Sequence, residues 1–209
     1  MSRTRIKYCG MTRVEDALLA ADLGVDAVGL VFTVRSKRRV AITQARAIRQ
    51  ALPPFVETVA LFMDDDALFV REVIAAVQPD LLQFHGTEPD DWCAQFDRRY
   101  LKAIGMGEGA AALSRLRAYP RAAALLLDGH GLGEAGGSGH AFDWSLLPSD
   151  LAQPLILAGG LHAGNVGEAI WRARPWAVDV ASGVEAAPGL KDAAKMQAFM
   201  QAVALADRS

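Results

Sequence analysis

Short apolar runs alternate along the whole chain with longer stretches that mix apolar and charged positions. Continuous apolar runs are typical of strands buried on both faces of a parallel sheet, and apolar positions three or four residues apart are typical of covering helices. The sequence predicts strands over residues 5–9, 26–32, 56–62, 81–84, 100–104, 122–127, 155–158 and 177–181. It predicts helices over residues 13–23, 43–52, 66–77, 89–96, 109–118, 144–147, 163–173 and 190–205. Eight strand-then-helix units of roughly 26 residues each predict an α/β fold, a closed (β/α)8 TIM barrel.

Composition limits the chain to one domain and excludes some partners. Of 209 residues, 52% are hydrophobic and 22% charged, which suffices for one core, so we expect residues 1–209 to form a single domain. The net charge of -2 and the pI of about 6.1 provide no basic field for nucleic acid. No apolar run approaches the roughly 18 residues of a membrane span, and no signal-peptide core opens the chain. Two distant cysteines, Cys9 and Cys93, predict neither a disulfide nor a metal site, so a cytoplasmic protein is expected.

Polar residues stand where several predicted strands end. They are Cys9, His85, Asp128 and Asp179. In a (β/α)8 barrel the carboxyl ends of the strands meet on one face and form the active site. Side-chain alternation places Lys7 with Cys9, and Gln83 with His85, on the same face of their strands.

Cys9 and Asp128 are a candidate base and acid. A thiol accepts a proton at neutral pH if local charge lowers its pKa from about 8.5, and a carboxyl group donates one if burial raises its pKa. Such a pair on different strands suits an isomerisation that moves protons between neighbouring atoms. Asp128 also precedes a glycine-rich segment, residues 129–139, which is unsuited to a helix and predicts a lid or a binding loop.

Two glycine-containing loops follow the last two predicted strands. The first contains Gly159 and Gly160, and the second contains Ser182 and Gly183. Loops at these positions hold phosphate in many barrels, because backbone N–H groups and a helix N-terminus face the ligand. Ser182 and Glu185 also match a capping box, which predicts that a short helix starts there.

Arg38 belongs to the basic cluster that follows the second predicted strand. That loop points to the active face, where a guanidinium group can hold a substrate carboxylate through two parallel hydrogen bonds. Arg38 is therefore the candidate residue for selecting the substrate.

Several motifs in this order resemble the phosphoribosylanthranilate isomerase family of tryptophan biosynthesis, over nearly the whole chain. They are KYCGMT (7–12), DAVGLVF (26–32), SKR (36–38), QFHG (83–86), LLLD (125–128), GGSGHAFDW (136–144), LAGGL (157–161) and DVASGVE (179–185). The resemblance implies an Amadori rearrangement of N-(5-phospho-β-D-ribosyl)anthranilate to 1-(2-carboxyphenylamino)-1-deoxyribulose 5-phosphate, without a cofactor or metal. The chain departs from the family at His140, where lysine is usual, and at Ala158, where serine is usual.

The resemblance also implies a role for each site residue. Asp128 would be the general acid and Cys9 the general base. Arg38 would hold the anthranilate carboxylate, and Asp179 would line the site beside the aromatic amine. His85 would either contact the substrate or have only a structural role at the end of its strand. The backbone of Gly159, Gly160, Ser182 and Gly183 would hold the phosphate. Partners would be limited to this phosphosugar, in a monomer or homodimer.

Three alternatives remain at this point. One is another phosphosugar isomerase, such as the aminoaldose isomerase of histidine biosynthesis, although such enzymes typically have a carboxylate where Cys9 stands. Another is a Schiff-base aldolase with Lys102 as its nucleophile. The third is a phosphosugar-binding module, which would need neither Cys9 nor Asp128. Cys93, which the helical pattern puts on an exposed side, is expected to have no catalytic role.

Overall fold

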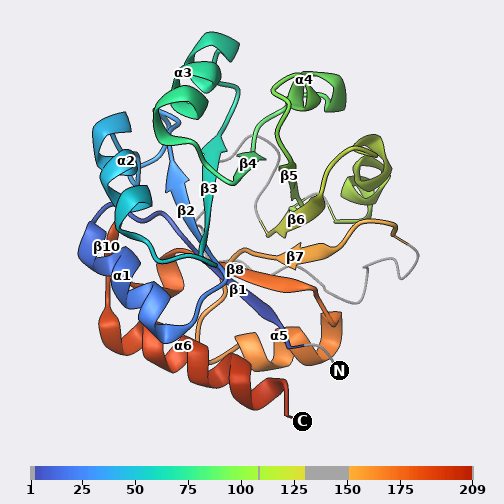
Figure 1. Ribbon diagram of the computed structural model, residues 1–209. Coiled ribbons are helices and arrows are strands. Elements are labelled where there is room, and N and C mark those ends of the chain that lie inside the picture. The colour runs from blue at the N-terminus through green and yellow to red at the C-terminus, as the bar shows by residue number, and fades with distance from the viewer. Residues whose placement is uncertain (1–2, 108, 130–150, 209) are drawn as a thin grey trace.

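The computed structural model describes residues 3–107, 109–129 and 151–208. In this part of the chain, eight parallel strands form a closed ring in sequence order (Figure 1). The strands are β1 (Arg5–Cys9), β2 (Ala27–Val31), β3 (Glu57–Phe62), β4 (Leu81–Phe84), β5 (Tyr100–Gly105), β6 (Ala124–Asp128), β7 (Leu155–Leu157) and β8 (Ala177–Val180). The ring closes where β1 pairs with β8, from Arg5 beside Ala177 to Tyr8 beside Val180. The predicted (β/α)8 barrel is therefore confirmed.

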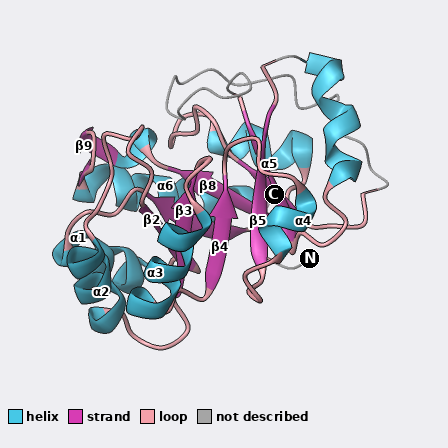
Figure 2. Cartoon of the chain, turned by 90° about the horizontal axis from the view of Figure 1, so that it is seen from above, coloured by secondary structure: helices cyan, strands magenta, loops and turns pink. Residues whose placement is uncertain are grey.

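Helices follow the strands and lie outside the ring (Figures 1 and 2). They are α1 (Val14–Leu23), α2 (Ile42–Ala51), α3 (Ala67–Val77), α4 (Asp90–Ala94), the 3-10 helix η1 (Gly109–Ala118), α5 (Val166–Ala173) and α6 (Ala193–Ala206). Their ends follow local chemistry. Gly24 ends α1 in the left-handed region at φ 92°, and the Asp66 side chain accepts a hydrogen bond from the Leu68 N–H at the start of α3.

Side chains alternate along each strand between two separate cores. Outward-facing residues such as Tyr8, Phe62 and Phe84 pack against the helices in the main hydrophobic core. Inward-facing residues, among them Val59, fill one end of the barrel as a second apolar cluster. The packing leaves the carboxyl ends of the strands for polar side chains, as in other (β/α)8 barrels.

The sequence predictions differ from the structure mainly after β8. The predicted helix over residues 190–205 is wrong at its start, because a small antiparallel hairpin of β9 (Glu185–Ala187) and β10 (Leu190–Lys191) precedes α6. Gly189 has φ 80°, which a left-handed turn between the two strands requires. The hairpin lies beside α1, where the Lys191 N–H donates to the Asp16 carboxylate (Figure 2).

Two predictions cannot be compared with this fold. The glycine-rich loop beyond Gly129 and the predicted helix over residues 144–147 lie outside the described residues, as does His140. The described helices include none that is long and apolar enough to cross a membrane.

Candidate active site

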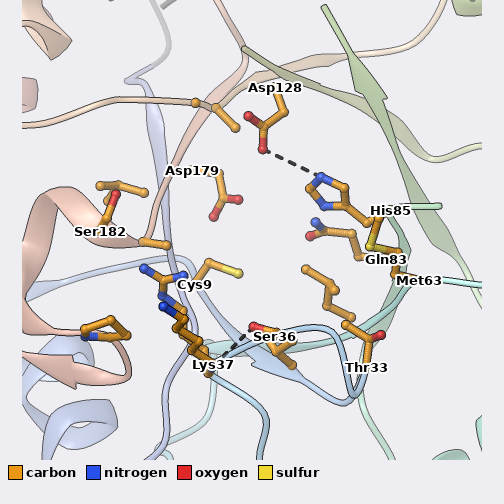
Figure 3. Close-up of a pocket in the computed structure, with 18 of the residues that line it drawn as sticks. Cys9, Thr33, Ser36, Lys37, Met63, Gln83, His85, Asp128, Asp179 and Ser182 are labelled. Atoms are coloured by element: carbon orange, nitrogen blue, oxygen red, sulfur yellow. Dashed lines mark hydrogen bonds and ion pairs between the residues drawn. The ribbon is translucent and has the colours of Figure 1, made fainter. Parts of the chain in front are cut away.

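A cavity of about 440 Å³ opens at the carboxyl ends of the barrel strands. Its wall includes side chains from β1, β4, β6 and β8, which Figure 3 shows pointing into a common space. The predicted residues that line it are Cys9, Arg38, His85, Asp128, Gly159, Gly160, Asp179 and Ser182. Gly183 is not part of the wall. A Cβ there would stand 2.0 Å from the Leu161 carbonyl oxygen, so this glycine lets the loops after β7 and β8 approach closely.

Asp128 is the last residue of β6, and its side chain is 9% exposed. One carboxylate oxygen lies 3.7 Å from Nε2 of His85, which points toward it across the cavity (Figure 3). Gly159, at φ 85°, leaves room on the other side, because a Cβ there would stand 2.8 Å from the second carboxylate oxygen. A carboxyl group beside an imidazole and a ligand cavity is suitably placed for proton transfer.

Cys9 is the last residue of β1, and its thiol points into the same cavity (Figure 3). Burial raises the pKa of the thiol, and the Asp179 carboxylate adds to this effect. The ammonium groups of Lys7 and Lys191 oppose it and offset it only in part. The local charges therefore do not produce a net lowering of the pKa of Cys9, because desolvation is the largest effect.

Arg38 is held by Glu185, the first residue of β9. Its Nε lies 2.9 Å from one carboxylate oxygen and its Nη2 lies 2.7 Å from the other. Gly10, at φ 76°, makes room for the Arg38 side chain, since a Cβ there would stand 2.5 Å from Cδ. Arg38 thus reaches the cavity with its orientation fixed by an almost fully buried carboxylate.

The short helix predicted to start at Ser182 is confirmed, but the capping box of Ser182 and Glu185 does not form. Ser182 is the first residue of a short 3-10 helix, η3 (Ser182–Val184), whose N-cap is Ala181, and no side chain caps it. The Glu185 side chain instead contacts Arg38 and Lys191, with Nζ of Lys191 at 3.0 Å. A charged partner forms a stronger hydrogen bond than a backbone N–H, which explains the choice.

The loop after β7 has the backbone expected of a ligand-binding turn. Gly159 and Gly160 have φ 85° and 62°. Asn165 precedes α5, its side-chain oxygen accepts from the His162 N–H at 2.8 Å, and its amide donates to the Gly160 carbonyl at 3.0 Å. The two glycines are therefore fixed beside a helix N-terminus.

Three residues beside Cys9 were missed in the sequence analysis. Lys7 forms an ion pair with Asp179, Lys191 contacts Glu185, and Gly29 provides space beside Cys9. Alternation along β1 had already put Lys7 on the face of Cys9 and was a usable signal. Lys191 gave no signal, because β10 falls within the predicted helix over residues 190–205.

Two other sequence interpretations change with the structure. Cys93 is fully buried, so its predicted exposure is wrong. Lys102 pairs in register with Phe84 and therefore faces the outer core, where its Nζ lies 2.7 Å from Glu88. It does not line the cavity, which removes the observation that supported a Schiff-base aldolase.

No group of three or more His, Cys, Asp or Glu side chains suited to a metal ion occurs among the described residues. The fold and the cavity together define a (β/α)8-barrel enzyme, with a carboxyl group and a thiol at the carboxyl ends of different strands.

Comparisons with known proteins identify the family. A sequence model of N-(5'-phosphoribosyl)anthranilate (PRA) isomerase matches residues 6–202, and the chain belongs to this family. The enzyme of that name from Xanthomonas oryzae pv. oryzae is 53% identical over 98% of this chain and 95% of its own length. The one from Pseudomonas putida is 53% identical over 97% and 98%.

Solved structures agree. Phosphoribosyl anthranilate isomerase from Thermotoga maritima superposes with a TM-score of 0.89 at 40% identity, over 96% of this chain and 98% of the other. A structure of the enzyme in complex with reduced 1-(o-carboxyphenylamino)-1-deoxyribulose 5-phosphate superposes with a TM-score of 0.86 at 38% identity, over 96% and 98%.

Proposed function

We propose that this chain converts N-(5-phospho-β-D-ribosyl)anthranilate into 1-(2-carboxyphenylamino)-1-deoxyribulose 5-phosphate, a step of tryptophan biosynthesis. The observation that carries the proposal is the placement of Asp128 and Cys9 on two strands with both side chains in one cavity (Figure 3). An Amadori rearrangement needs such an acid and such a base. It breaks the bond between a ring oxygen and carbon, and it moves a proton from the adjacent carbon.

Asp128 acts first, as the general acid. It gives its proton to the ribose ring oxygen while the bond from that oxygen to C1 breaks, and the amine lone pair forms a C1–N iminium. The positive nitrogen acidifies the C2–H bond. Cys9, as the thiolate, then takes the C2 proton, and the C–H electrons form a C1–C2 double bond that neutralises the iminium.

The resulting enolamine tautomerises to the ketone, since the C2 hydroxyl loses its proton while C1 gains one. The raised pKa of Cys9 fits this role, because a thiolate of higher pKa is a stronger base. The cost is that only a small part of the enzyme carries the thiolate at neutral pH.

Substrate binding is assigned to the cavity wall. We propose that Arg38 holds the anthranilate carboxylate and that Asp179 and His85 contact the substrate near the amine and sugar. The phosphate would bind at the backbone of Gly159, Gly160 and Ser182 in the wall, and of Gly183 directly behind it. The positive φ of Gly159 and Gly160 supports this assignment, since it turns successive N–H groups toward one ligand.

The test is turnover of phosphoribosylanthranilate, made in situ and followed by loss of its fluorescence. Wild type should be active, and Cys9→Ser and Asp128→Asn should each lose about 10²-fold or more in kcat, as for loss of a general base or acid. Cys93→Ser is the matched control, because it makes the same chemical change at a cysteine outside the cavity. An inactive wild type, or variants equal to wild type, would refute the proposal.

Two further proposals concern the localisation and the assembly of the enzyme. We propose a cytoplasmic enzyme that is a monomer or a homodimer. One structure at 36% identity is described as mutually generated monomers of the dimeric enzyme from Thermotoga maritima, which supports both forms for relatives. Light scattering of the purified chain would distinguish them.

A further inference from the structure

A buried ammonium group lies beside the candidate base. Lys7, on β1, has its Nζ 2.9 Å from a carboxylate oxygen of Asp179 on β8, and the two side chains are 5% and 9% exposed. Removing two charges from water costs free energy. Replacing a buried ion pair by apolar residues of similar size therefore leaves many proteins as stable or more stable. The pair therefore suggests a role in the chemistry of the cavity that Asp179 lines.

Lys7 and Cys9 meet at one point inside the barrel. They lie two residues apart on β1, so both side chains face inward. A Cβ on Gly29, in the neighbouring strand β2, would stand 2.7 Å from Sγ of Cys9 and 3.2 Å from Nζ of Lys7. The missing side chain of Gly29 is thus the space in which the thiol and the ammonium group approach each other.

Several other charges surround the thiol, and most are already paired. Lys191 points its Nζ to the Cys9 carbonyl at 2.5 Å, but Glu185 lies 3.0 Å from that ammonium group. Arg38 is also bound to Glu185. Across the cavity, His85 and Asp128 lie together.

Lys7 differs from these cations in its relation to Cys9. Its charge lowers the pKa of the thiol more than the charge of Lys191 does. Its carboxylate partner, Asp179, acts on the same thiol in the opposite sense. The two charges of one ion pair therefore have opposed effects on one sulfur atom.

We propose that the Lys7–Asp179 ion pair sets how readily Cys9 ionises, with Lys7 stabilising the thiolate and Asp179 limiting that stabilisation. Both are positioning residues in this respect, since they act through Cys9. The catalytic consequence rests on the proposed function, but the ionisation of Cys9 does not.

The experiment measures alkylation of Cys9 by iodoacetamide as a function of pH, because only the thiolate reacts. Peptide mass spectrometry separates Cys9 from Cys93. The latter is buried away from the cavity, and its pKa is raised to about 12, chiefly by burial, so it serves as an internal reference. The intact chain is used throughout.

Two single variants should move the titration in opposite directions. In Lys7→Met, the midpoint for Cys9 should rise by about one pH unit or more, and alkylation at pH 7.5 should slow about tenfold. In Asp179→Asn, the midpoint should fall and alkylation should be faster. An unchanged midpoint in Lys7→Met, or a rise in Asp179→Asn, would overturn the proposal.

Lys7→Met leaves Asp179 buried without its partner and can impair folding. The double variant Lys7→Met/Asp179→Asn removes both charges and avoids this. Its midpoint must exceed that of Asp179→Asn, and equal midpoints would overturn the proposal. Lys102→Met is the matched control, since it also removes a buried strand lysine from an ion pair, here with Glu88 on the outer side of the barrel. It should leave the Cys9 midpoint unchanged, and a shift equal to that of Lys7→Met would refute a specific effect.

The rate of isomerisation separates this inference from the proposed function. If the wild type does not isomerise phosphoribosylanthranilate but Cys9 responds to Lys7 as predicted, the ion pair stands and the substrate assignment fails. If the wild type is active and the alkylation midpoint of Cys9 is the same in Lys7→Met as in wild type, the function stands and the ion pair has only a structural role.

Discussion

At the scale of single residues, the site depends on glycines as much as on charged groups. Gly29 leaves space for the thiol and ammonium groups, Gly159 for the Asp128 carboxylate, and Gly10 for Arg38. Neither Gly10 nor Gly29 has a charge or a hydrogen-bonding side chain that would mark it as part of a site. Their importance follows from packing, because a close-packed interior has no room for an added side chain at either position.

Gly29→Ala tests this view. The new methyl group would stand 2.7 Å from Sγ of Cys9, so the thiol and Lys7 must move. We expect overpacking to lower the free energy of unfolding by about 1–3 kcal/mol. We also expect kcat to fall by about 10²-fold, because a displaced base no longer reaches the C2 proton. Urea unfolding and the fluorescence assay measure the two effects, and unchanged kcat would show that the thiol has room to move.

The pH dependence of kcat follows from the thiol. Because burial raises the pKa of Cys9, the proposed base is mostly protonated at neutral pH. Activity should therefore rise with pH through the neutral range, by about tenfold per unit where the thiolate limits the rate. A kcat that is flat from pH 6 to 8 would be inconsistent with a protonated Cys9 in this range.

At the scale of elements, the β9–β10 hairpin after the last barrel strand, β8, contributes charged side chains beside the site. Glu185 opens the hairpin, Lys191 closes it, and together with Arg38 they form one network between the loops after β2 and β8. Although burial opposes it, Arg38 and Lys191 lower the pKa of Glu185. Burial lowers the pKa of Lys191, and Glu185 offsets this only in part. The network therefore stabilises the charged form of Glu185 but not that of Lys191.

Glu185→Gln should destabilise the protein in a pH-dependent way. A carboxyl group whose pKa is lowered on folding contributes stability above its unfolded pKa, near 4.5, and loses it as pH falls through the folded value. Removing one partner of a buried ion pair costs about 3 kcal/mol. We expect the variant to unfold more easily than wild type at pH 7, and the gap to close below pH 4.5. A gap that is constant with pH would mean that Glu185 is not charged in the fold.

The same variant should weaken substrate binding. Without its carboxylate, Arg38 loses its fixed orientation, so KM for phosphoribosylanthranilate should rise about tenfold while kcat changes less. Asp192→Ala is the control, because Asp192 caps α6 outside the cavity wall. Equal KM values in Glu185→Gln and wild type would separate Glu185 from substrate binding.

At the scale of the whole molecule, hydrogen bonds connect the start of the first strand, β1, to the end of the last helix, α6. Asp207, at the end of α6, accepts hydrogen bonds from the Thr4 N–H at 2.8 Å and the Thr4 hydroxyl at 2.6 Å. These contacts precede β1, which closes the ring with β8 and ends at Cys9. The contact between Thr4 and Asp207 thus helps to fix the strand that ends at Cys9.

Asp207→Ala should leave the buried Thr4 N–H without its acceptor. We expect a loss of about 1–3 kcal/mol in the free energy of unfolding, the cost of an unpaired buried polar group. Denaturant unfolding measures it. Asp207→Asn, which keeps an acceptor oxygen, should lose less, and equal losses in the two variants would assign the effect to charge instead.

Much of this architecture could be predicted from the sequence, because it depends on local pattern. Apolar runs marked the strands, and polar residues at their ends identified Cys9, Asp128 and Asp179 as neighbours. The position of the Glu185 side chain could not be predicted, since Arg38 is far away in sequence, Lys191 fell within a predicted helix, and a nearby serine offered a local cap. The start of α6 was missed for a similar reason, because the two-residue strand β10 is too short to show a period.

The most direct test of the two proton transfers uses substrate that carries deuterium at C2 of the sugar. Single-turnover rates would be measured with labelled and unlabelled substrate in Cys9→Ser and Asp128→Asn. We predict that deuterium slows Cys9→Ser, because removal of the C2 proton limits its rate. It should not slow Asp128→Asn, in which ring opening limits the rate. Slowing confined to Asp128→Asn would contradict the assignment of Cys9 as the base and Asp128 as the acid.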